Sequence, residues 1–236
     1  MRTLDEYRHI FFDMDGTVTR SCTPATPEME KLLKGLIDSG RSVMIISGQL
    51  NDVIERNVPV ASFYMGQNGN HTVNAETGEE LWKNVLTDKE KKEIFTHIES
   101  LPRDWAVRDE NDLLSDRGAQ IAYSLIGHNE DIDKKEAFDP KGEKRKALLE
   151  EFPLESDTIE VKIGGTTTFD YIKKGFHKGV NVQHLIDHEG WNSAECLYVG
   201  DALFPGGNDE AVIGVIDTRA VKGPRETQDV IKEILK

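Results

Sequence analysis

The sequence predicts an α/β protein, with a parallel-sheet core and a smaller α+β module inserted into it. Strand and helix patterns alternate in the first third of the chain and again in the last third, which is typical of a parallel sheet with helices on both faces. Between these parts the pattern changes to two helices and several alternating strands. We therefore expect a core formed by residues 1–85 and 175–236, and an inserted cap formed by residues 86–174.

Three short apolar runs in the first part of the core predict buried strands. Each run leads into polar residues or glycine, which suits strands that end at a ligand-binding edge. The runs cover residues 9–15, 41–47 and 62–69. The last of them is followed by residues 71–82, which predict a hairpin with its turn at Thr77 and Gly78.

Two helices are expected between these strands. Residues 26–40 predict the first helix, because Thr26 can cap its N-terminus and Pro27 suits the first helical position. Its apolar residues recur with helical spacing, and Gly40 can end it. Residues 49–57 predict the second, shorter helix.

The rest of the core and the cap complete the prediction. In the last part of the core, we expect helices at residues 178–190 and 226–236, and strands at residues 195–201 and 214–218. In the cap, we expect helices at residues 87–101 and 142–152, and strands at residues 118–127, 157–165 and 167–173. The alternation within the cap strands indicates an antiparallel sheet with one polar face.

The composition limits the partners that this chain can have. The formal net charge of −14 argues against nonspecific binding to nucleic acids or anionic membranes, because those partners select basic patches. The longest apolar runs fall well short of the roughly 20 residues that span a bilayer. The first residues carry no apolar signal region, so we expect a cytoplasmic protein. The two cysteines, Cys22 and Cys196, predict neither a disulfide framework nor a zinc site.

Polar side chains collect where the predicted core strands end. Asp13 and Asp15 finish the first strand, and Ser47 with Gly48 follows the second. Lys178 opens the late helix. The next strand leads to Asp201, Asn208 and Asp209. Because ligands of open α/β sheets bind at the C-terminal ends of strands, and because carboxylates suit Mg²⁺ while hydroxyl and ammonium groups suit phosphate, this set predicts a site for Mg²⁺ and a phosphate group.

These residues resemble the four motifs of the haloacid dehalogenase superfamily of phosphotransferases. The match consists of "DMDGT" at residues 13–17, Ser47, Lys178 and "GDALFPGGND" at residues 200–209, in the order of that family. The resemblance implies a Rossmann-like core with an inserted cap.

The resemblance also implies a role for each residue. Asp13 would be the nucleophile that becomes phosphorylated, and Asp15 the general acid and base. The Mg²⁺ ligands would be Asp13, Asp15 through its backbone carbonyl, Asp201 and, through water, Asp209. The phosphate group and substrate would contact Ser47, Gly48, Lys178 and Asn208.

Within the superfamily, the chain resembles the eukaryotic-type phosphomannomutase branch, whose cap is of type IIB. The resemblance rests on the motif "GDALFPGGNDEA" and on two cap segments, "RGAQIAYSLIGH" and "IGGTTTFDYIKKG". It implies that Arg117 binds the distal phosphate, and that Thr168 and Asp170 contact sugar hydroxyls. The chain departs from the branch at His128 and Ala106, where relatives have arginine; Arg108 lies near the second position but does not match it.

The resemblance leads to a Mg²⁺-dependent phosphotransferase that acts on sugar phosphates through a phosphoaspartyl intermediate. A sugar-phosphate phosphatase is the alternative, because arginine binds phosphate bidentately and histidine replaces it poorly in a mutase. A non-catalytic phosphate-binding module is a third and more remote hypothesis. The expected cofactor is Mg²⁺, with a hexose 1,6-bisphosphate activator for a mutase. The expected partner is a small phosphorylated metabolite such as a hexose phosphate, bound by a monomer or homodimer.

Overall fold

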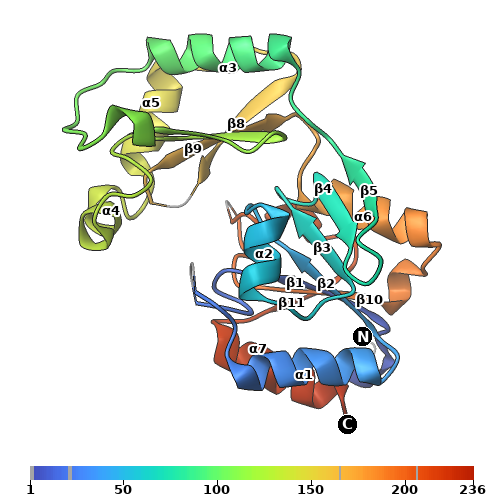
Figure 1. The fold of residues 1–236 in the computed structure, drawn as a ribbon. Helices are drawn as coiled ribbons and strands as arrows, with labels where there is room; N and C mark the ends of the chain where they lie inside the picture. The colour runs from blue at the N-terminus through green and yellow to red at the C-terminus, as the bar shows by residue number, and fades with distance from the viewer. Residues whose placement is uncertain (1–2, 21–22, 165, 206) are drawn as a thin grey trace. The chain divides into compact units, whose positions relative to one another are not determined.

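A computed structural model describes residues 3–20, 23–164, 166–205 and 207–236 of the chain (Figure 1). Three residues that the sequence analysis includes lie outside the described ones, namely Cys22, Gly165 and Gly206. The chain divides into two compact units. The core comprises Met1–Lys83 and Phe176–Lys236, and the cap comprises Asn84–Gly175.

The core is built on one seven-stranded sheet with the order β11-β10-β1-β2-β3-β4-β5 (Figure 1). Its strands are β1 (His9–Asp13), β2 (Ser42–Ile46), β3 (Phe63–Gly66), β4 (His71–Asn74), β5 (Glu80–Lys83), β10 (Cys196–Gly200) and β11 (Asp217–Ala220). The strands from β11 to β3 pair in parallel, whereas β3, β4 and β5 form an antiparallel meander. The predicted parallel-sheet core and the predicted hairpin are confirmed.

Helices cover both faces of this sheet, as the alternation in the sequence predicted. They are α1 (Pro27–Asp38), α2 (Asn51–Asn57), α6 (Lys178–Glu189) and α7 (Pro224–Ile234). Successive side chains of a strand point to opposite faces. Ile10 and Phe12 of β1 therefore pack with residues of α1 and α7. Phe11 packs on the other face, in a cluster that includes residues of α6 such as Leu185.

The start of α1 follows the predicted capping. Thr26 accepts a hydrogen bond from the backbone N–H of Met29 at 3.3 Å, and Pro27 is the first helical residue. Gly40 follows the helix with φ of +84°, a left-handed conformation that glycine adopts readily. Sequence and local structure therefore agree at both ends of this helix.

The last strand lies later in the chain than predicted. The apolar residues of the range 214–218 suggested a strand there, but β11 begins at Asp217 and all four of its residues are exposed. Ile213 bridges to Ile216 around Gly214, whose φ is +86°, and Val215 and Ile216 pack against the core from this turn. The apolar residues thus belong to the turn, and the edge strand that follows is polar.

The cap contains a four-stranded antiparallel sheet with the order β6-β7-β9-β8, as predicted for an α+β module. Its elements are α3 (Asp88–Ser100), β6 (Leu114–Asp116), β7 (Gln120–Ser124), α4 (Ile132–Phe138), α5 (Glu143–Glu151), β8 (Ile159–Gly164) and β9 (Thr168–Lys173). The sequence did not indicate α4 or β6, because both are short and carry little apolar periodicity. A separate hydrophobic cluster, with Ile94 of α3 and Phe169 of β9, fills the cap.

The described residues also include four short 3-10 helices: η1 (Leu4–Glu6), η2 (Glu110–Asp112), η3 (Ser193–Glu195) and η4 (Glu210–Val212). Within the described part of the chain, no helix has the length and apolar character that crossing a membrane requires.

Candidate active site

The strand register brings the polar strand ends of the core to one edge of the sheet. Asp13 at the end of β1 lies opposite Ile46, so Ser47 follows at the same level. On the other side of β1, Phe12 pairs with Val199, which places Gly200 and then Asp201 beside Asp13. Parallel strands end at a common edge, so side chains far apart in the sequence meet there.

Asp13 and Lys178 form a buried ion pair at this edge. The Lys178 Nζ donates to Asp13 Oδ1 at 2.6 Å and to Asp209 Oδ1 at 2.7 Å. Lys178 is the first residue of α6, and its side chain is 1% exposed. Gly179 follows it, and a Cβ there would lie 1.9 Å from the backbone oxygen of Ala211. Glycine thus allows the start of α6 to pack closely on η4, which directly follows Asp209.

The electrostatics of the pair reflect its burial. Burial raises the pKa of Asp13, Lys178 lowers it and Asp209 raises it, which together bring it to about 7. Burial alone would lower the pKa of Lys178, but Asp13 and Asp209 raise it above its ordinary value. Lys178 therefore stays protonated at neutral pH, while the charge of Asp13 responds to pH and to neighbouring cations.

Tyr198 of β10 completes the cluster. Its hydroxyl donates to Asp209 Oδ1 at 2.6 Å and accepts from the Lys178 Nζ at 3.3 Å. Burial and the charges of Asp209 and Asp13 raise its pKa well above the ordinary value. Tyr198 is not evident as a site residue from the sequence, because "ECLYVGD" reads as an apolar strand. It could have been suspected from the sequence only because a buried tyrosine hydroxyl needs a hydrogen-bond partner.

Asp201 lies at the exposed side of the same cluster. Thr17 Oγ1 donates to Asp201 Oδ1 at 3.2 Å, and burial together with Asp209 raises the pKa of Asp201. Gly16 has φ of +84°, and a Cβ on it would lie 2.5 Å from Asp201 Oδ2. The glycine of "DMDGT" thus leaves room for the second acidic motif to approach the first.

The three carboxylates fit a divalent cation. Asp13, Asp201 and Asp209 each offer an oxygen atom, and these atoms lie within 4.8 Å of one another. Asp13 and Asp209 are buried, and within the described cluster Lys178 is the one cation that faces them. Three carboxylates with a single ammonium leave an excess of negative charge, which a hard, oxygen-binding ion such as Mg²⁺ would neutralise.

The other core residues of the prediction lie on neighbouring loops. Ser47 is buried at the end of β2, where its Oγ accepts from the Gln49 N–H at 3.2 Å, and Gly48 follows it. Asp15 lies in the tight turn after β1, paired with Thr19 in an isolated bridge. Asn208 is exposed in the loop before Asp209. The structure thus gathers Asp13, Lys178, Asp201 and Asp209 at one edge of the sheet, and Asp15, Ser47, Gly48 and Asn208 lie on the adjoining loops.

In the cap, two of the predicted substrate residues interact. Burial raises the pKa of Asp170 on β9, while the charge of Arg117 and a hydrogen bond from Gln120 act to lower it. Asp116 does not compete for Arg117, since it pairs with Lys91 at 2.6 Å.

Thr168 stands two residues before Asp170 on the same strand. Its hydroxyl donates to the backbone oxygen of Gly164 at 2.6 Å, which closes the turn between β8 and β9. Arg117 thus acts electrostatically on Asp170, and the Thr168 hydroxyl is bound to the Gly164 backbone.

His128 is held by backbone contacts. It is half-buried, and burial lowers its pKa. Its Nε2 lies 3.3 Å from the backbone oxygen of Ala122, to which the neutral ring donates. The Lys135 Nζ donates to the backbone oxygen of His128 at 2.6 Å, and Arg108 donates to that of Asn129 at 2.7 Å. Lys135 and Arg108 thus contact the backbone of the loop around His128. Ala106 is exposed.

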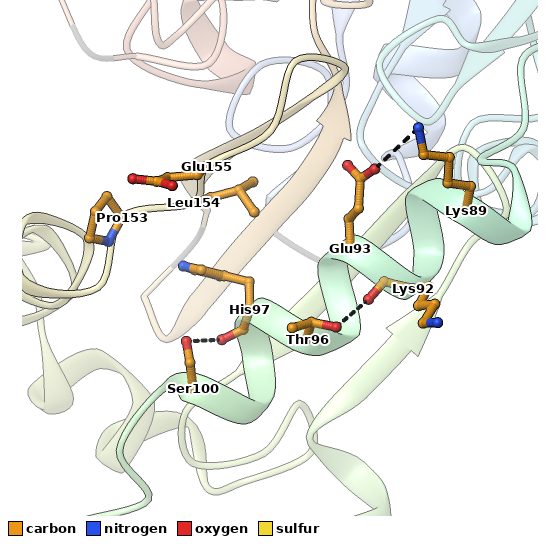
Figure 2. Close-up of a pocket in the computed structure, with 9 residues that line it drawn as sticks. All are labelled: Lys89, Lys92, Glu93, Thr96, His97, Ser100, Pro153, Leu154 and Glu155. Atoms are coloured by element: carbon orange, nitrogen blue, oxygen red, sulfur yellow. Dashed lines mark hydrogen bonds and ion pairs between the residues drawn. The ribbon is translucent and has the colours of Figure 1, made fainter.

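The cap also carries a groove elsewhere, of about 580 Å³. Figure 2 shows that it lies between α3 and the segment of residues 153–155. Its lining includes His97, whose ring contacts the Tyr171 hydroxyl and the Phe152 backbone oxygen, both at 2.8 Å. The residues that line the groove include none of the predicted site residues.

Comparison with known proteins agrees with this geometry. The sequence model of the haloacid dehalogenase-like hydrolase family matches residues 10–213. The chain therefore belongs to this family of enzymes, which confirms the resemblance drawn from the four motifs.

Its relatives among characterised sequences include phosphomannomutases. The chain is 24% identical to the phosphomannomutase of Drosophila melanogaster, covering 96% of this chain and 94% of that protein. It is 27% identical to that of Spinacia oleracea, covering 94% of each. Among solved structures, a subclass IIB sugar phosphatase superposes with a TM-score of 0.61 at 16% identity, covering 94% of this chain and 91% of that one. At that identity the likeness shows the fold alone.

Proposed function

We propose that this enzyme is a Mg²⁺-dependent phosphotransferase that acts on sugar phosphates through a phosphoaspartyl intermediate on Asp13, as a phosphomannomutase does. The observation that carries the proposal is the cluster at the end of the parallel strands, in which Asp13, Lys178 and Asp209 are buried and Asp201 is exposed. The phosphomannomutase relatives, which match almost the whole chain, support the choice of substrate class.

In the first step, an Asp13 carboxylate oxygen attacks the phosphorus atom, and the bond from phosphorus to the sugar oxygen breaks. Asp15 gives its proton to that departing oxygen. The attack brings two anions together, and Lys178 offsets their repulsion as charge develops on the transferring group. Asp13, the Asp15 carbonyl and Asp201, with Asp209 through water, would hold Mg²⁺, which would supply further positive charge.

In the second step, the incoming hydroxyl attacks the phosphorus atom of phospho-Asp13. Asp15 now takes the proton of that hydroxyl, and the bond between phosphorus and Asp13 breaks to restore the carboxylate. The hydroxyl belongs to a sugar phosphate in a mutase and to water in a phosphatase. Asp15 thus starts and ends the cycle protonated, and Asp13 starts and ends it ionised.

The remaining residues are proposed to hold the substrate. Ser47, Gly48 and Asn208 would contact the transferring phosphoryl group. Arg117 would bind the distal phosphate, because its guanidinium can donate two parallel hydrogen bonds to phosphate oxygens. Thr168 and Asp170 would contact sugar hydroxyls.

One observation favours hydrolysis as the second candidate. A mutase must hold a bisphosphorylated intermediate, for which cationic ligands are needed at both ends. His128 stands where the resemblance to the phosphomannomutase branch implies an arginine; its pKa is lowered and it donates to the Ala122 backbone. A neutral imidazole in this arrangement adds no positive charge for a distal phosphate. Transfer to water requires ligands for only one phosphate group. A phosphatase therefore tolerates the missing cationic ligand better than a mutase does.

An assay with mannose 1-phosphate and a catalytic amount of hexose 1,6-bisphosphate separates the candidates. Formation of mannose 6-phosphate supports the mutase, whereas release of inorganic phosphate alone supports the phosphatase. Asp13→Asn should abolish either activity, and Asp38→Asn, in an exposed pair with Lys34, should not. No turnover across a panel of sugar phosphates, with inorganic phosphate still bound, would instead support a non-catalytic module.

A further inference from the structure

Tyr198 lies at the centre of the ion cluster, and no sequence motif accounts for it. Its side chain is fully buried on β10. Its hydroxyl donates to Asp209 Oδ1 at 2.6 Å and accepts from the Lys178 Nζ at 3.3 Å. Because Lys178 also donates to the same Asp209 oxygen at 2.7 Å, the three groups form a closed triangle of hydrogen bonds.

Packing alone does not require a hydroxyl at this position. The ring of Tyr198 belongs to an apolar cluster with neighbours such as Phe11 and Met44, where phenylalanine would pack as well. A buried hydroxyl destabilises the fold unless it is hydrogen-bonded. Any favourable effect of the Tyr198 hydroxyl therefore comes from its hydrogen bonds with its two charged partners.

Gly200 is a second feature that serves the same arrangement. A Cβ on Gly200 would lie 2.4 Å from Asp209 Oδ2 and 2.8 Å from Tyr198 Cε1. A larger residue would therefore push Asp209 and Tyr198 out of their present positions. The glycine at the end of β10 leaves the space in which the tyrosine and the carboxylate meet.

We propose that Tyr198 is a positioning residue for phosphoryl transfer, which holds Asp209 and, through it, directs the Lys178 ammonium at Asp13. The inference rests on the proposed function, since it takes Asp13 as the nucleophile and Lys178 as the cation that faces the phosphoryl group.

The hydrogen bonds restrict the Asp209 carboxylate on both sides. Oδ1 accepts from Lys178 and Tyr198, and Oδ2 accepts from the Ala202 N–H at 3.2 Å. The Lys178 ammonium has three N–H bonds, and its contact with Tyr198 is the longest of its three. When a phosphoryl group binds, the ammonium can exchange that contact for a phosphoryl oxygen. Asp209, still held by Tyr198, keeps the ammonium in place during the exchange.

The test compares Tyr198→Phe with Tyr7→Phe. Tyr7 is a matched control, because its buried side chain also donates to a carboxylate, Asp217, at 2.7 Å in the same unit. With p-nitrophenyl phosphate as the probe, we expect Tyr198→Phe to lower kcat about tenfold and to change KM less than about threefold, because alignment matters most as charge develops. Its Tm should fall no further than that of Tyr7→Phe, whose kcat should stay within about twofold of wild type.

A double-mutant cycle tests the route of the effect. If Tyr198 acts through Lys178, adding Tyr198→Phe to Lys178→Met should change the single-turnover rate less than about twofold. A hydroxyl that merely stabilises the fold would cause the same loss in both backgrounds. An equal loss in both backgrounds therefore overturns the positioning role.

The outcomes distinguish this inference from the proposed function. Tyr198→Phe with kcat within about twofold of wild type, beside an inactive Asp13→Asn, overturns the role of Tyr198 alone. A fully active Asp13→Asn overturns the proposed function. Should Tyr198→Phe not fold, a crystal structure of the wild type with orthovanadate decides. A Tyr198 hydroxyl on Asp209, with Lys178 on a vanadate oxygen, supports the inference, and a hydroxyl turned away from Asp209 overturns it.

Discussion

Replacing Lys178 by methionine removes the ammonium and keeps a side chain of similar length. In the wild type, the Lys178 Nζ lies 2.6 Å from Asp13 and 2.7 Å from Asp209, and all three side chains are buried. Removing one partner of a buried ion pair costs about 3–5 kcal/mol, because the remaining charge stays buried. For a chain of this size, that cost corresponds to a Tm lowered by roughly 6–20 °C. We expect this loss at pH 8 without divalent cations.

The loss should depend on pH in a defined direction. The folded pKa of Asp13 is raised from 3.8 to about 7, so the unfolded state binds fewer protons between these values. The contribution of Asp13 to the free energy of unfolding therefore decreases as pH rises through that window, and the positive charge of Lys178 makes this decrease smaller. In Lys178→Met that charge is gone, so the Tm difference from wild type should be larger at pH 8 than at pH 5. Adding Mg²⁺ at pH 8 should recover part of the difference by binding the folded state.

Differential scanning calorimetry measures these Tm differences. The Tm is taken from the transition of the core, because the cap can unfold separately. Lys34→Met is the matched control. Lys34 pairs with Asp38 at 2.9 Å, but both side chains are more than half exposed, so the change should cost less than about 1 kcal/mol. A Tm of Lys178→Met that matches wild type at pH 8, or a loss of equal size at pH 5 and pH 8, would refute the reasoning.

Three further changes have clear expected outcomes. Gly179→Ala should lower the free energy of unfolding by about 3 kcal/mol or more, measured by urea denaturation, because its Cβ would lie 1.9 Å from the Ala211 backbone oxygen. Gly35→Ala, in the middle of α1 with only a side-chain carbon at 3.4 Å, should instead be neutral or stabilise by up to about 1 kcal/mol; a matching loss in both variants would contradict the steric argument. Arg145→Met should destabilise the cap by about 3–5 kcal/mol, seen as faster limited proteolysis, because Arg145 forms a buried pair with Asp139 at 2.9 Å. Unchanged proteolysis would contradict this. Removing divalent cations with EDTA should abolish turnover, and added Mg²⁺ should restore it; full activity in EDTA would contradict a metal requirement.

The sequence pattern predicted much of the core, because strand ends are easily recognised. Apolar runs that finish on polar residues indicated β1, β2 and β10, and parallel pairing then brings Asp13 and Asp201 to one edge. The start of a helix indicated Lys178 in the same way. These features are local in sequence, and topology alone brings them together.

What the sequence could not predict depends on side-chain direction. Tyr198 lies in an apolar strand, and nothing in "ECLYVGD" tells that its hydroxyl reaches Asp209. Arg145 stands in a run of charged residues, and the sequence does not tell which of them turns into the cap to bind Asp139. The predicted position of the last strand was wrong for a similar reason. Val215 and Ile216 are apolar because they lie in a turn that packs on the core, before β11 begins.

If Asp13 carries the phosphoryl group during turnover, that group can be trapped on it. The enzyme would be mixed with a turned-over sugar phosphate and Mg²⁺, quenched in acid within the first turnover, digested and analysed by mass spectrometry. We expect a phosphoryl group on Asp13 in the peptide that contains "DMDGT", and none in Asp13→Asn. Phosphate on another residue, or turnover that continues in Asp13→Asn, would contradict it.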